Sequence, residues 1–248
     1  MSGLSTSARL DSRSAQHQRT LTAGVTGSAH YTWGRSLSYT GGDIGATFQG
    51  DSTNVVQDFF NWRSERGPSA GDVIHYFASD VVWDMPFLRD ASNGFVRTAL
   101  GGWQLSSVFR AQTGDALTVT QPSAIPASRP DYIGGNAVLD NYRDTLVYLN
   151  TTAFARVPIH PVSRATIRPG NIGNGAIRGP GRWDLDLSLG KNFRFRERAN
   201  LQFRADAFNA FNHTNLSNPN TSIESPLFGR ITGTRGARVI QLNARFSF

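Results

Sequence analysis

The 248-residue sequence has no cysteine, a single lysine and few charged residues. Without cysteine the chain can form no disulfide, no thiolate metal site and no cysteine nucleophile. Charged residues make up 17% of the chain and hydrophobic residues 39%, whereas soluble proteins average about 25% charged residues. This composition excludes a wholly disordered chain, because disorder requires low hydrophobicity together with high charge.

Long apolar runs and enzyme motifs are also missing. No run approaches the ~18 apolar residues of a membrane-spanning helix, and residues 1–5 lack the basic and apolar segments of a signal peptide. The sequence holds no His-Glu-x-x-His, Gly-x-Ser-x-Gly or phosphate-loop motif. We therefore expect no enzyme activity, no catalytic residue, no metal site and no cofactor.

The charge that is present is mostly arginine. The chain has 25 basic and 18 acidic residues, a net charge of +7, and Lys191 is its one lysine. The arginines are spread along the sequence instead of forming a basic arm or stripe. This distribution argues against nucleic acid as a partner.

Apolar and polar residues alternate with a period of two in several segments, which predicts β-strands with one apolar face. One of these segments runs for about 15 residues, whereas soluble strands average ~5–6. The expected strands are residues 20–34, 73–85, 101–111, 183–193, 201–211 and 239–248, and residues 4–11 are expected to be the end of a seventh strand.

The connections between these strands alternate between short and long. Short connections are expected at 12–19, 86–96 and 196–199, and long ones at 36–71, 113–181 and 212–236, with 113–181 largely irregular. Outer-membrane barrels combine tight periplasmic turns with long extracellular loops in this way. The sequence therefore predicts an all-β fold: a transmembrane antiparallel β-barrel segment of six to seven strands, an incomplete barrel with long extracellular loops.

The two strand faces suit a barrel wall with lipid on one side and water on the other. Aromatic residues near strand ends on the apolar face are candidates for the membrane interface: Tyr31, Trp33, Trp83, Trp103, Trp183 and Phe193. Charged residues on the polar face are candidates for the lumen wall: Asp184, Asp186, Arg204, Asp206 and Arg245, with Asp80, Asp84 and Arg110. We expect Asp184 and Asp186 to pair with Arg204 on the neighbouring strand.

Five sequence blocks resemble TonB-dependent outer-membrane receptors of the Oar-like, carboxypeptidase-regulatory type. They are GNIGN at 170–174, IRGPGRWDLDLSL at 177–189, LQFRADAFNAFNHTN at 201–215, FGRI at 228–231 and RVIQLNARFSF at 238–248. Segments 31–36, 102–106 and 112–114 are similar to further strands of these receptors. The glycine-rich run at 170–181 could form an anion-binding nest, although loop re-entry into a strand is the favoured interpretation.

The resemblance implies that residues 1–248 are the C-terminal portion of a receptor barrel, with signal peptide, plug and TonB box absent. The implied function is a share in substrate uptake or surface binding, without activity of the chain alone. Its implied partners are outer-membrane lipid and lipopolysaccharide, the barrel-assembly machinery that reads Phe246 and Phe248, and the TonB system only through the missing N-terminal parts.

Two soluble alternatives remain open at the level of sequence. One is a β-sandwich with a single buried face. The other is a basic β-protein that binds polysaccharide or nucleic acid through exposed arginine and aromatic side chains. The face on which Trp33, Trp83, Trp103 and Trp183 lie separates these alternatives from a membrane barrel.

Overall fold

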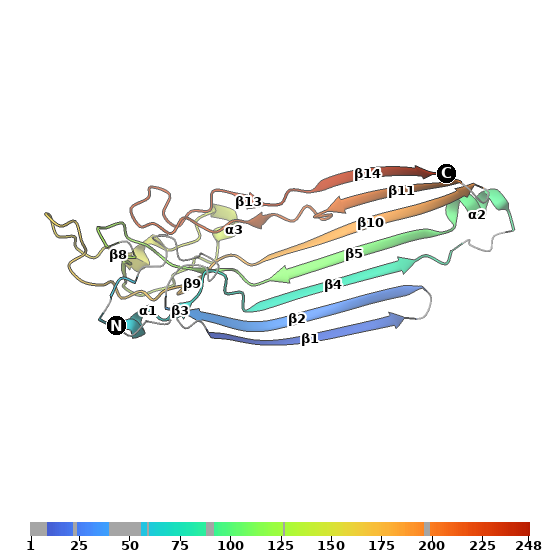
Figure 1. The fold of residues 1–248 in the computed structure, drawn as a ribbon. Coiled ribbons are helices and arrows are strands. Elements are labelled where there is room, and N and C mark those ends of the chain that lie inside the picture. The colour runs from blue at the N-terminus through green and yellow to red at the C-terminus, as the bar shows by residue number, and fades with distance from the viewer. Residues whose placement is uncertain are drawn as a thin grey trace.

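The computed structural model describes residues 9–21, 24–39, 56–58, 60–87, 92–125, 127–195 and 199–248. Within these residues, seven long strands pair in chain order into one antiparallel sheet (Figure 1). They are β1 (Arg9–Leu21), β2 (Val25–Ser38), β4 (His75–Asp84), β5 (Trp103–Gln112), β10 (Arg182–Phe195), β11 (Ala199–Phe208) and β14 (Val239–Ser247).

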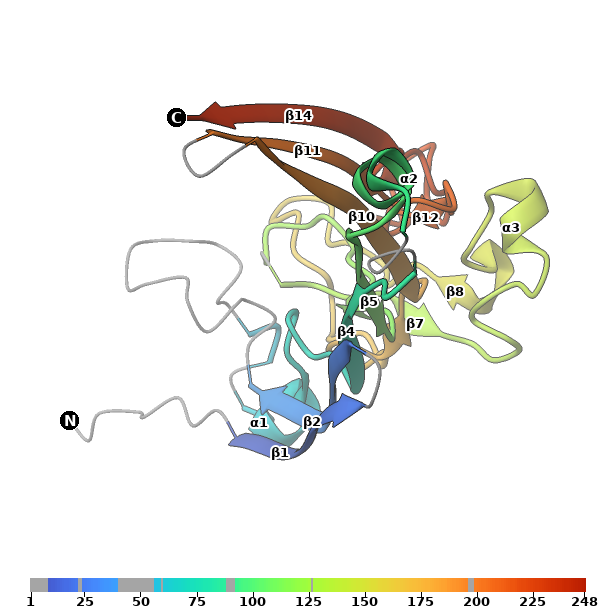
Figure 2. The same ribbon diagram turned by 90° about the vertical axis from the view of Figure 1, so that its right-hand side faces the viewer.

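The sheet is curved and open. Figure 2 shows it bending so that both outer strands turn toward the same side, which makes one face concave and the other convex. Among the described residues β1 pairs only with β2, and β14 only with β11. Two strand edges therefore carry backbone N–H and C=O groups without a neighbouring strand.

The described parts of the long connections lie at one end of the sheet (Figure 1). Helix α2 (Gly94–Leu100), in the connection between β4 and β5, lies at the other end. Asn93 caps this helix, because its side-chain oxygen accepts hydrogen bonds from the backbone N–H groups of Phe95 (2.9 Å) and Val96 (3.4 Å). No described helix is both long and apolar enough to cross a membrane.

The long connections contain short elements of their own. Two-residue strand β3 (Gly67–Pro68) extends the pairing of β2. Three short helices lie in these connections: α1 (Trp62–Glu65), α3 (Tyr142–Thr145) and the 3-10 helix η2 (Thr151–Ala153). Three further pairs of two-residue strands are β6 (Ala116–Leu117) with β9 (Ile177–Arg178), β7 (Asp131–Tyr132) with β8 (Phe154–Ala155), and β12 (Asn215–Leu216) with β13 (Thr234–Arg235).

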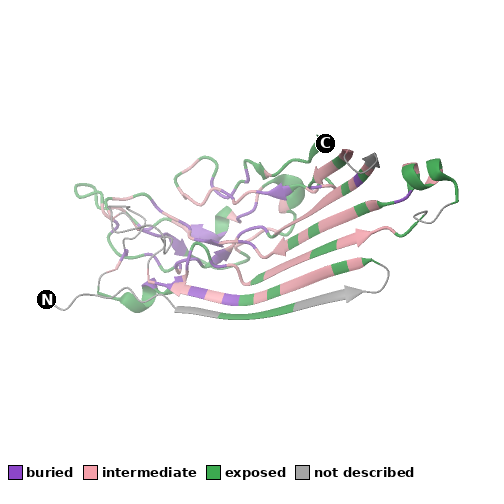
Figure 3. Cartoon of the chain, turned by 45° about the vertical axis from the view of Figure 1, so that its right-hand side comes forward, coloured by how far each residue is buried: buried purple, intermediate pink, exposed green. Residues whose placement is uncertain are grey.

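The hydrophobic core lies among the long connections and not on the sheet. Buried residues are concentrated at the long-loop end, while the strands are half-buried or exposed over most of their length (Figure 3). The core cluster consists of Leu117, Val119, Tyr148, Leu149, Ala153, Phe154, Ile172, Ile177, Leu216, Phe228 and Ile231. Neither face of the long sheet is therefore covered by a second layer along its whole length, as a soluble sandwich would require.

The strands expected over 73–85, 101–111, 183–193, 201–211 and 239–248 are confirmed to within a few residues at their ends. The expected connection at 12–19 is wrong, because β1 runs through it and Leu21 pairs with Val25 across the turn. Gly24, with φ of +78°, provides the left-handed conformation that this turn requires. Of the strand expected at residues 4–11, residues 9–11 belong to β1 and residues 4–8 lie outside the described residues.

Segment 113–181 is largely irregular, as expected: its described helices and strands are each only two to four residues long. It is nevertheless folded, because its short strands pair with one another and it supplies most of the core cluster. In the short connection 85–102, Asn93 precedes the helix α2 that begins at Gly94. Asparagine is favoured at this position, because its side chain caps helix N-termini.

Candidate functional site

The apolar faces of neighbouring strands form continuous rows across the sheet. One row consists of Val25, Trp83, Leu105, Leu189, Ala205 and Leu242, each directly opposite the next. We call the side of the sheet that carries this row the apolar face. Leu189 and Leu242 are exposed and the other four are half-buried, so no other part of the described chain covers this row completely.

Aromatic residues border this apolar face at both ends. At the long-loop end, Tyr31 lies opposite Phe77, Phe77 opposite Ala111, and Ala111 opposite Trp183. At the short-turn end, the aromatic residues are Trp83, Trp103 and Phe193, joined by Phe203 and Phe246. The structure thus places all six predicted interface aromatics on one face, in two separate groups.

The opposite, polar face carries hydrogen bonds and ion pairs across strands. Arg110 on β5 contacts both predicted carboxylates of β10: its Nε lies 2.9 Å from Asp184, and its Nη2 bonds Asp186. Gln104 donates to Asp84 over 2.9 Å. Because these groups have partners within the sheet, they can border water as paired and not as isolated charges.

The expected pairing of Asp184 and Asp186 with Arg204 is wrong. Strand register places Arg204 opposite Gly190, whereas Asp184 lies opposite Arg110. Arg204 instead contacts Asp206 two residues along its own strand, at 2.7 Å. Asn243 donates to the same carboxylate from β14. Arg245 lies opposite Gln202 on the polar face, as its parity predicts.

Lys191 is a functional residue that the sequence reasoning missed. Its parity places it on the apolar face, opposite Trp103, yet it is only 2% exposed. The ammonium group donates to the carbonyl oxygens of Ala99 (2.8 Å) and Gly101 (2.6 Å), and lies 5.0 Å from the ring centroids of Trp103 and Phe193. The carbonyl groups at the end of α2 thus stabilise its charge, and the lysine attaches the helix to the sheet.

β1 departs from the alternation of the other strands. Arg13 lies directly opposite Trp33, and therefore occupies the apolar-face position of its strand. Residues 12–16 are all exposed. The first strand of the sheet thus lacks the apolar stripe that the next six strands share.

The long connections fold together into what we call the loop unit: residues 56–74, 113–181 and 209–238. Backbone hydrogen bonds join its second and third segments, including Tyr148 N–H to the Gly229 carbonyl (2.7 Å) and Ile231 N–H to the Leu146 carbonyl (2.8 Å). Gly229 has φ of +77°, and a Cβ there would lie 2.9 Å from the Leu149 oxygen. The close approach at this position therefore requires glycine.

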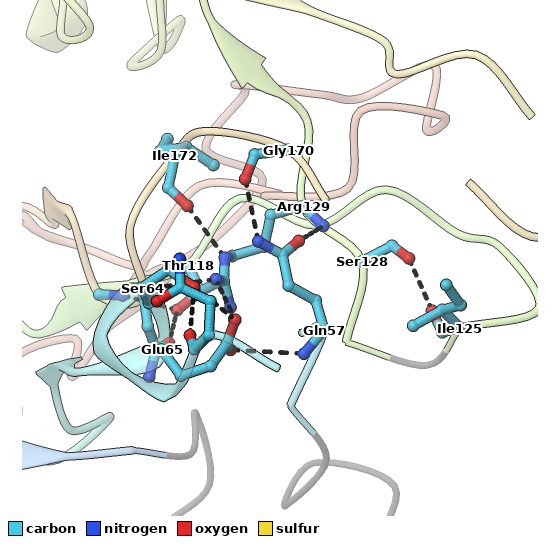
Figure 4. A network of polar contacts seen from close by, with 12 residues as sticks. Gln57, Ser64, Glu65, Thr118, Ile125, Ser128, Arg129, Gly170 and Ile172 are labelled. Carbon is cyan, nitrogen blue, oxygen red and sulfur yellow. Dashed lines mark hydrogen bonds and ion pairs between the residues drawn. The ribbon is translucent and has the colours of Figure 1, made fainter. Parts of the chain in front are cut away.

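Buried charges join the first and second segments of the loop unit. Arg129 binds Glu65 through two N–O contacts of 2.8 and 2.9 Å (Figure 4). Its Nε donates to the Ile172 carbonyl over 2.9 Å. Gln57 accepts from the Arg129 backbone N–H (3.0 Å) and donates to the Gly170 carbonyl (2.9 Å). Every polar group of this network has a partner, which fixes the two segments in one arrangement.

Asp72 links the loop unit to the sheet, and a second ion pair lies within the loop unit. The buried carboxylate of Asp72 accepts from the Ser36 backbone N–H at the end of β2 and from Arg178 on β9. Asp131 binds Arg168 at 2.6 and 2.9 Å, and this guanidinium lowers the pKa of the Asp131 carboxyl. The loop unit is therefore held by ion pairs at its edges as well as by its apolar core.

The glycine-rich run at 170–181 serves close backbone packing. A Cβ at Gly170 would lie 2.0 Å from the Arg129 oxygen, and one at Gly175 would lie 2.4 Å from the Pro68 oxygen. Gly175 also has φ of +59°. These contacts support the interpretation of the run as a loop returning to a strand, in which bare backbone must pass other backbone closely.

Comparison with known proteins gives one match. Residues 4–241 match the family described as outer membrane beta barrel domain. No curated protein and no solved structure matches the chain. The family match confirms the expected β-barrel fold class and the expected outer-membrane location. An outer-membrane location is incompatible with the two soluble alternatives, the β-sandwich and the soluble basic β-protein. With its long antiparallel strands, its uncovered apolar face and this match over nearly its whole length, the chain belongs to the outer membrane beta barrel domain family.

Proposed function

We propose that this chain is the C-terminal part of the barrel of a TonB-dependent receptor, in which the loop unit contributes to ligand binding at the cell surface. The observation that carries the proposal is an open seven-strand sheet with a folded loop unit at one end only. Barrel diameter grows with strand number, and seven strands enclose no transport lumen. Further strands must therefore join β1 and β14 to complete the wall.

The geometry of the two faces supports this arrangement. The groove that Arg143 of α3 shares with Tyr31, Phe77 and Trp183 lies on the apolar face, and Figure 2 shows α3 outside the convex side of the sheet. The apolar face is thus convex and the polar face concave. In a closed barrel the convex face meets lipid and the concave face lines the lumen, as outer-membrane barrels require.

The aromatic and charged residues take their proposed roles from this orientation. Tyr31, Trp33 and Trp183 would lie at the outer membrane interface, and Trp83, Trp103 and Phe193 at the periplasmic interface. Arg110, Asp184 and Asp186 would border the hydrated lumen. The long loops would be extracellular, because the tight turns of such barrels face the periplasm.

The end of the chain has a separate proposed role in assembly. Phe246 continues the apolar face of β14, opposite Leu201, and Phe248 is almost fully exposed. An aromatic terminus after alternating apolar residues resembles the signal that the barrel-assembly machinery reads. We assign that role to Phe246 and Phe248.

The TonB part of the proposal can be tested in the native host. An epitope inserted after Val162, which is 85% exposed in the loop unit, leaves both the strands and Phe248 intact. The tagged protein would be the full-length receptor that the proposal expects in the native host, with the N-terminal TonB box. It would be extracted from outer membranes and passed over the immobilised periplasmic domain of TonB, with a general porin as the control. We expect the tagged protein to be retained and the porin to pass through. Assembled tagged protein that also passes through would contradict TonB coupling.

A further inference from the structure

The apolar face contains a groove at its long-loop end, directly below the loop unit. Its volume is about 830 Å³. Residues of four neighbouring strands line it, together with Arg143 of α3 and with Arg178 and Arg182. The strand residues that matter for its shape are Tyr31, His75, Phe77, Phe109, Ala111 and Trp183.

The small side chain of Ala111 leaves space at the floor of the groove. It lies between Phe77 on one neighbouring strand and Trp183 on the other, so a methyl group stands where both neighbours carry large rings. Phe109 stands one position along the same face, with its ring centroid 6.0 Å from Phe77 and 6.1 Å from Trp183. The result is an aromatic channel that fits a hydrocarbon chain.

The far wall is formed by a stacked polar pair. Tyr31 and His75 stack with ring centroids 6.1 Å apart, and the Tyr31 hydroxyl lies 2.7 Å from His75 Nδ1. Tyrosine at a membrane interface places its ring among acyl chains and its hydroxyl near the headgroups. This pair therefore marks the level at which the channel passes from hydrocarbon to headgroup.

One arginine at the rim has a charge that is available to a ligand. Arg178 is engaged with Asp72, and Arg182 shares the strand parity of Asp184 and so belongs to the polar face. Arg143 is exposed, and its guanidinium lies 5.5 Å from the centroid of the Tyr142 ring. It forms no ion pair within the described part of the chain. Arginine binds phosphate with paired hydrogen bonds, so Arg143 favours a phosphorylated ligand.

A second hollow beside the groove has room for a headgroup. It measures about 500 Å³ and shares Arg143 and Trp183 with the groove. His213 forms part of its wall and stacks on Trp183, with ring centroids 4.1 Å apart and an interplanar angle of 24°. Flat stacked rings beside an arginine suit a sugar that carries phosphate.

We propose that this groove binds one phosphorylated glycolipid of the outer leaflet, the lipid A part of lipopolysaccharide. One acyl chain lies over Ala111, and a sugar phosphate binds Arg143. The long-loop end faces the cell exterior, where this glycolipid forms the leaflet, and the apolar face meets it directly. The proposal rests on the outer-membrane location of the chain and on the orientation proposed above, with extracellular long loops and a lipid-facing apolar face, and it does not depend on coupling to TonB.

The test uses the full-length protein purified from outer membranes in mild detergent and titrated with purified lipid A, with tryptophan fluorescence as the readout. Arg143→Gln removes the phosphate partner, and Ala111→Leu fills the channel. Arg63→Gln, an exposed arginine outside the groove, is the matched control. We expect roughly tenfold weaker binding for each groove variant, and none of this loss for the control.

Two further probes identify the ligand chemistry. Dephosphorylated lipid A should bind the wild type roughly tenfold less tightly and should no longer distinguish the arginine variant from the wild type. Phosphatidylglycerol, which carries phosphate without the sugar, should bind more weakly than lipid A. If Ala111→Leu fails to assemble, the arginine variant decides. Unchanged lipid A affinity in the arginine variant, or equal affinity for phosphatidylglycerol, would overturn the proposal.

Discussion

Arg129 forms a bidentate ion pair with Glu65, with N–O distances of 2.8 and 2.9 Å, and the two side chains are only 4% and 2% exposed. The residues belong to different long connections, so the pair joins segments that are far apart in the sequence. Removing one partner of a buried ion pair leaves an uncompensated buried charge, which typically costs ~3–5 kcal/mol. The arrangement of the loop unit therefore depends on this pair.

Glu65→Gln should destabilise the loop unit by about 3 kcal/mol or more, because the Arg129 charge is left buried without its counter-charge. Limited proteolysis of the protein in outer membranes measures this as faster cleavage within 113–181. Glu224→Gln is the control, since its partner Arg156 is 61% exposed and such surface pairs contribute at most ~1 kcal/mol. Equal cleavage rates in the two variants would contradict a structural role for the buried pair.

Tyr148 should make the loop unit sensitive to alkali. Its buried hydroxyl donates to the Arg178 carbonyl over 2.6 Å, and burial, with a smaller effect of Tyr142, raises the pKa of Tyr148 to about 12. An unfolded tyrosine has a pKa of ~10. The folded state thus favours the neutral hydroxyl, so this contribution to stability is complete below pH ~10 and is lost as the pH rises through about 12.

The measurement is the protease resistance of the loop unit across that alkaline window. Tyr148→Phe should be less stable than wild type at neutral pH by about 1 kcal/mol, through the lost hydrogen bond, but should show a flatter loss between pH ~10 and ~12. Tyr132→Phe, at a more exposed tyrosine, is the control and should follow the wild-type curve. A Tyr148→Phe curve with the wild-type slope would refute the assignment.

Phe248→Ala should reduce the amount of assembled protein in the outer membrane, because it removes the terminal aromatic of the proposed assembly signal. Folding of the loop unit should be unaffected, since Phe248 is 97% exposed and lies outside the core cluster. Quantitative blotting of outer-membrane fractions measures the level, and Phe211→Ala, at an exposed loop aromatic, is the control. Wild-type levels of the Phe248 variant in the outer membrane would contradict the role of Phe248 in the proposed assembly signal.

The long strands could be predicted from sequence because a membrane imposes the same alternation on each strand separately. Leu185, Leu187 and Leu189 mark one face of β10 without any knowledge of its neighbours. The same alternation does not predict β1, because polar residues such as Ser12, Arg13 and Ser14 stand at successive positions. It also does not predict the turn at Gly24, since small residues continue the alternation from β1 into β2.

The loop unit and the charge partners could not be predicted, because both depend on contacts between distant segments. Leu149 is buried in a cluster with Phe228 and Ile231 from another connection, and no local period marks such a relationship. Arg110 rather than Arg204 meets Asp184 because strand register decides which residues are opposite. Lys191 was missed for a related reason: its partners come from the end of α2, which the sequence pattern did not indicate.

The central claim is that one face of the sheet meets lipid and the other meets water, and neighbouring residues of β10 test it most directly. Leu187 lies on the apolar face between Ser107 and Ala207, and Ser188 on the polar face between Ser106 and Asp206. An arginine facing lipid near the middle of the membrane costs ~2–4 kcal/mol, whereas a lumen position tolerates it. The measurement is the level of assembled, heat-modifiable protein in outer membranes for Leu187→Arg and Ser188→Arg. We predict a strong loss for Leu187→Arg and near-normal assembly for Ser188→Arg; equal levels, or the reverse order, would contradict the account.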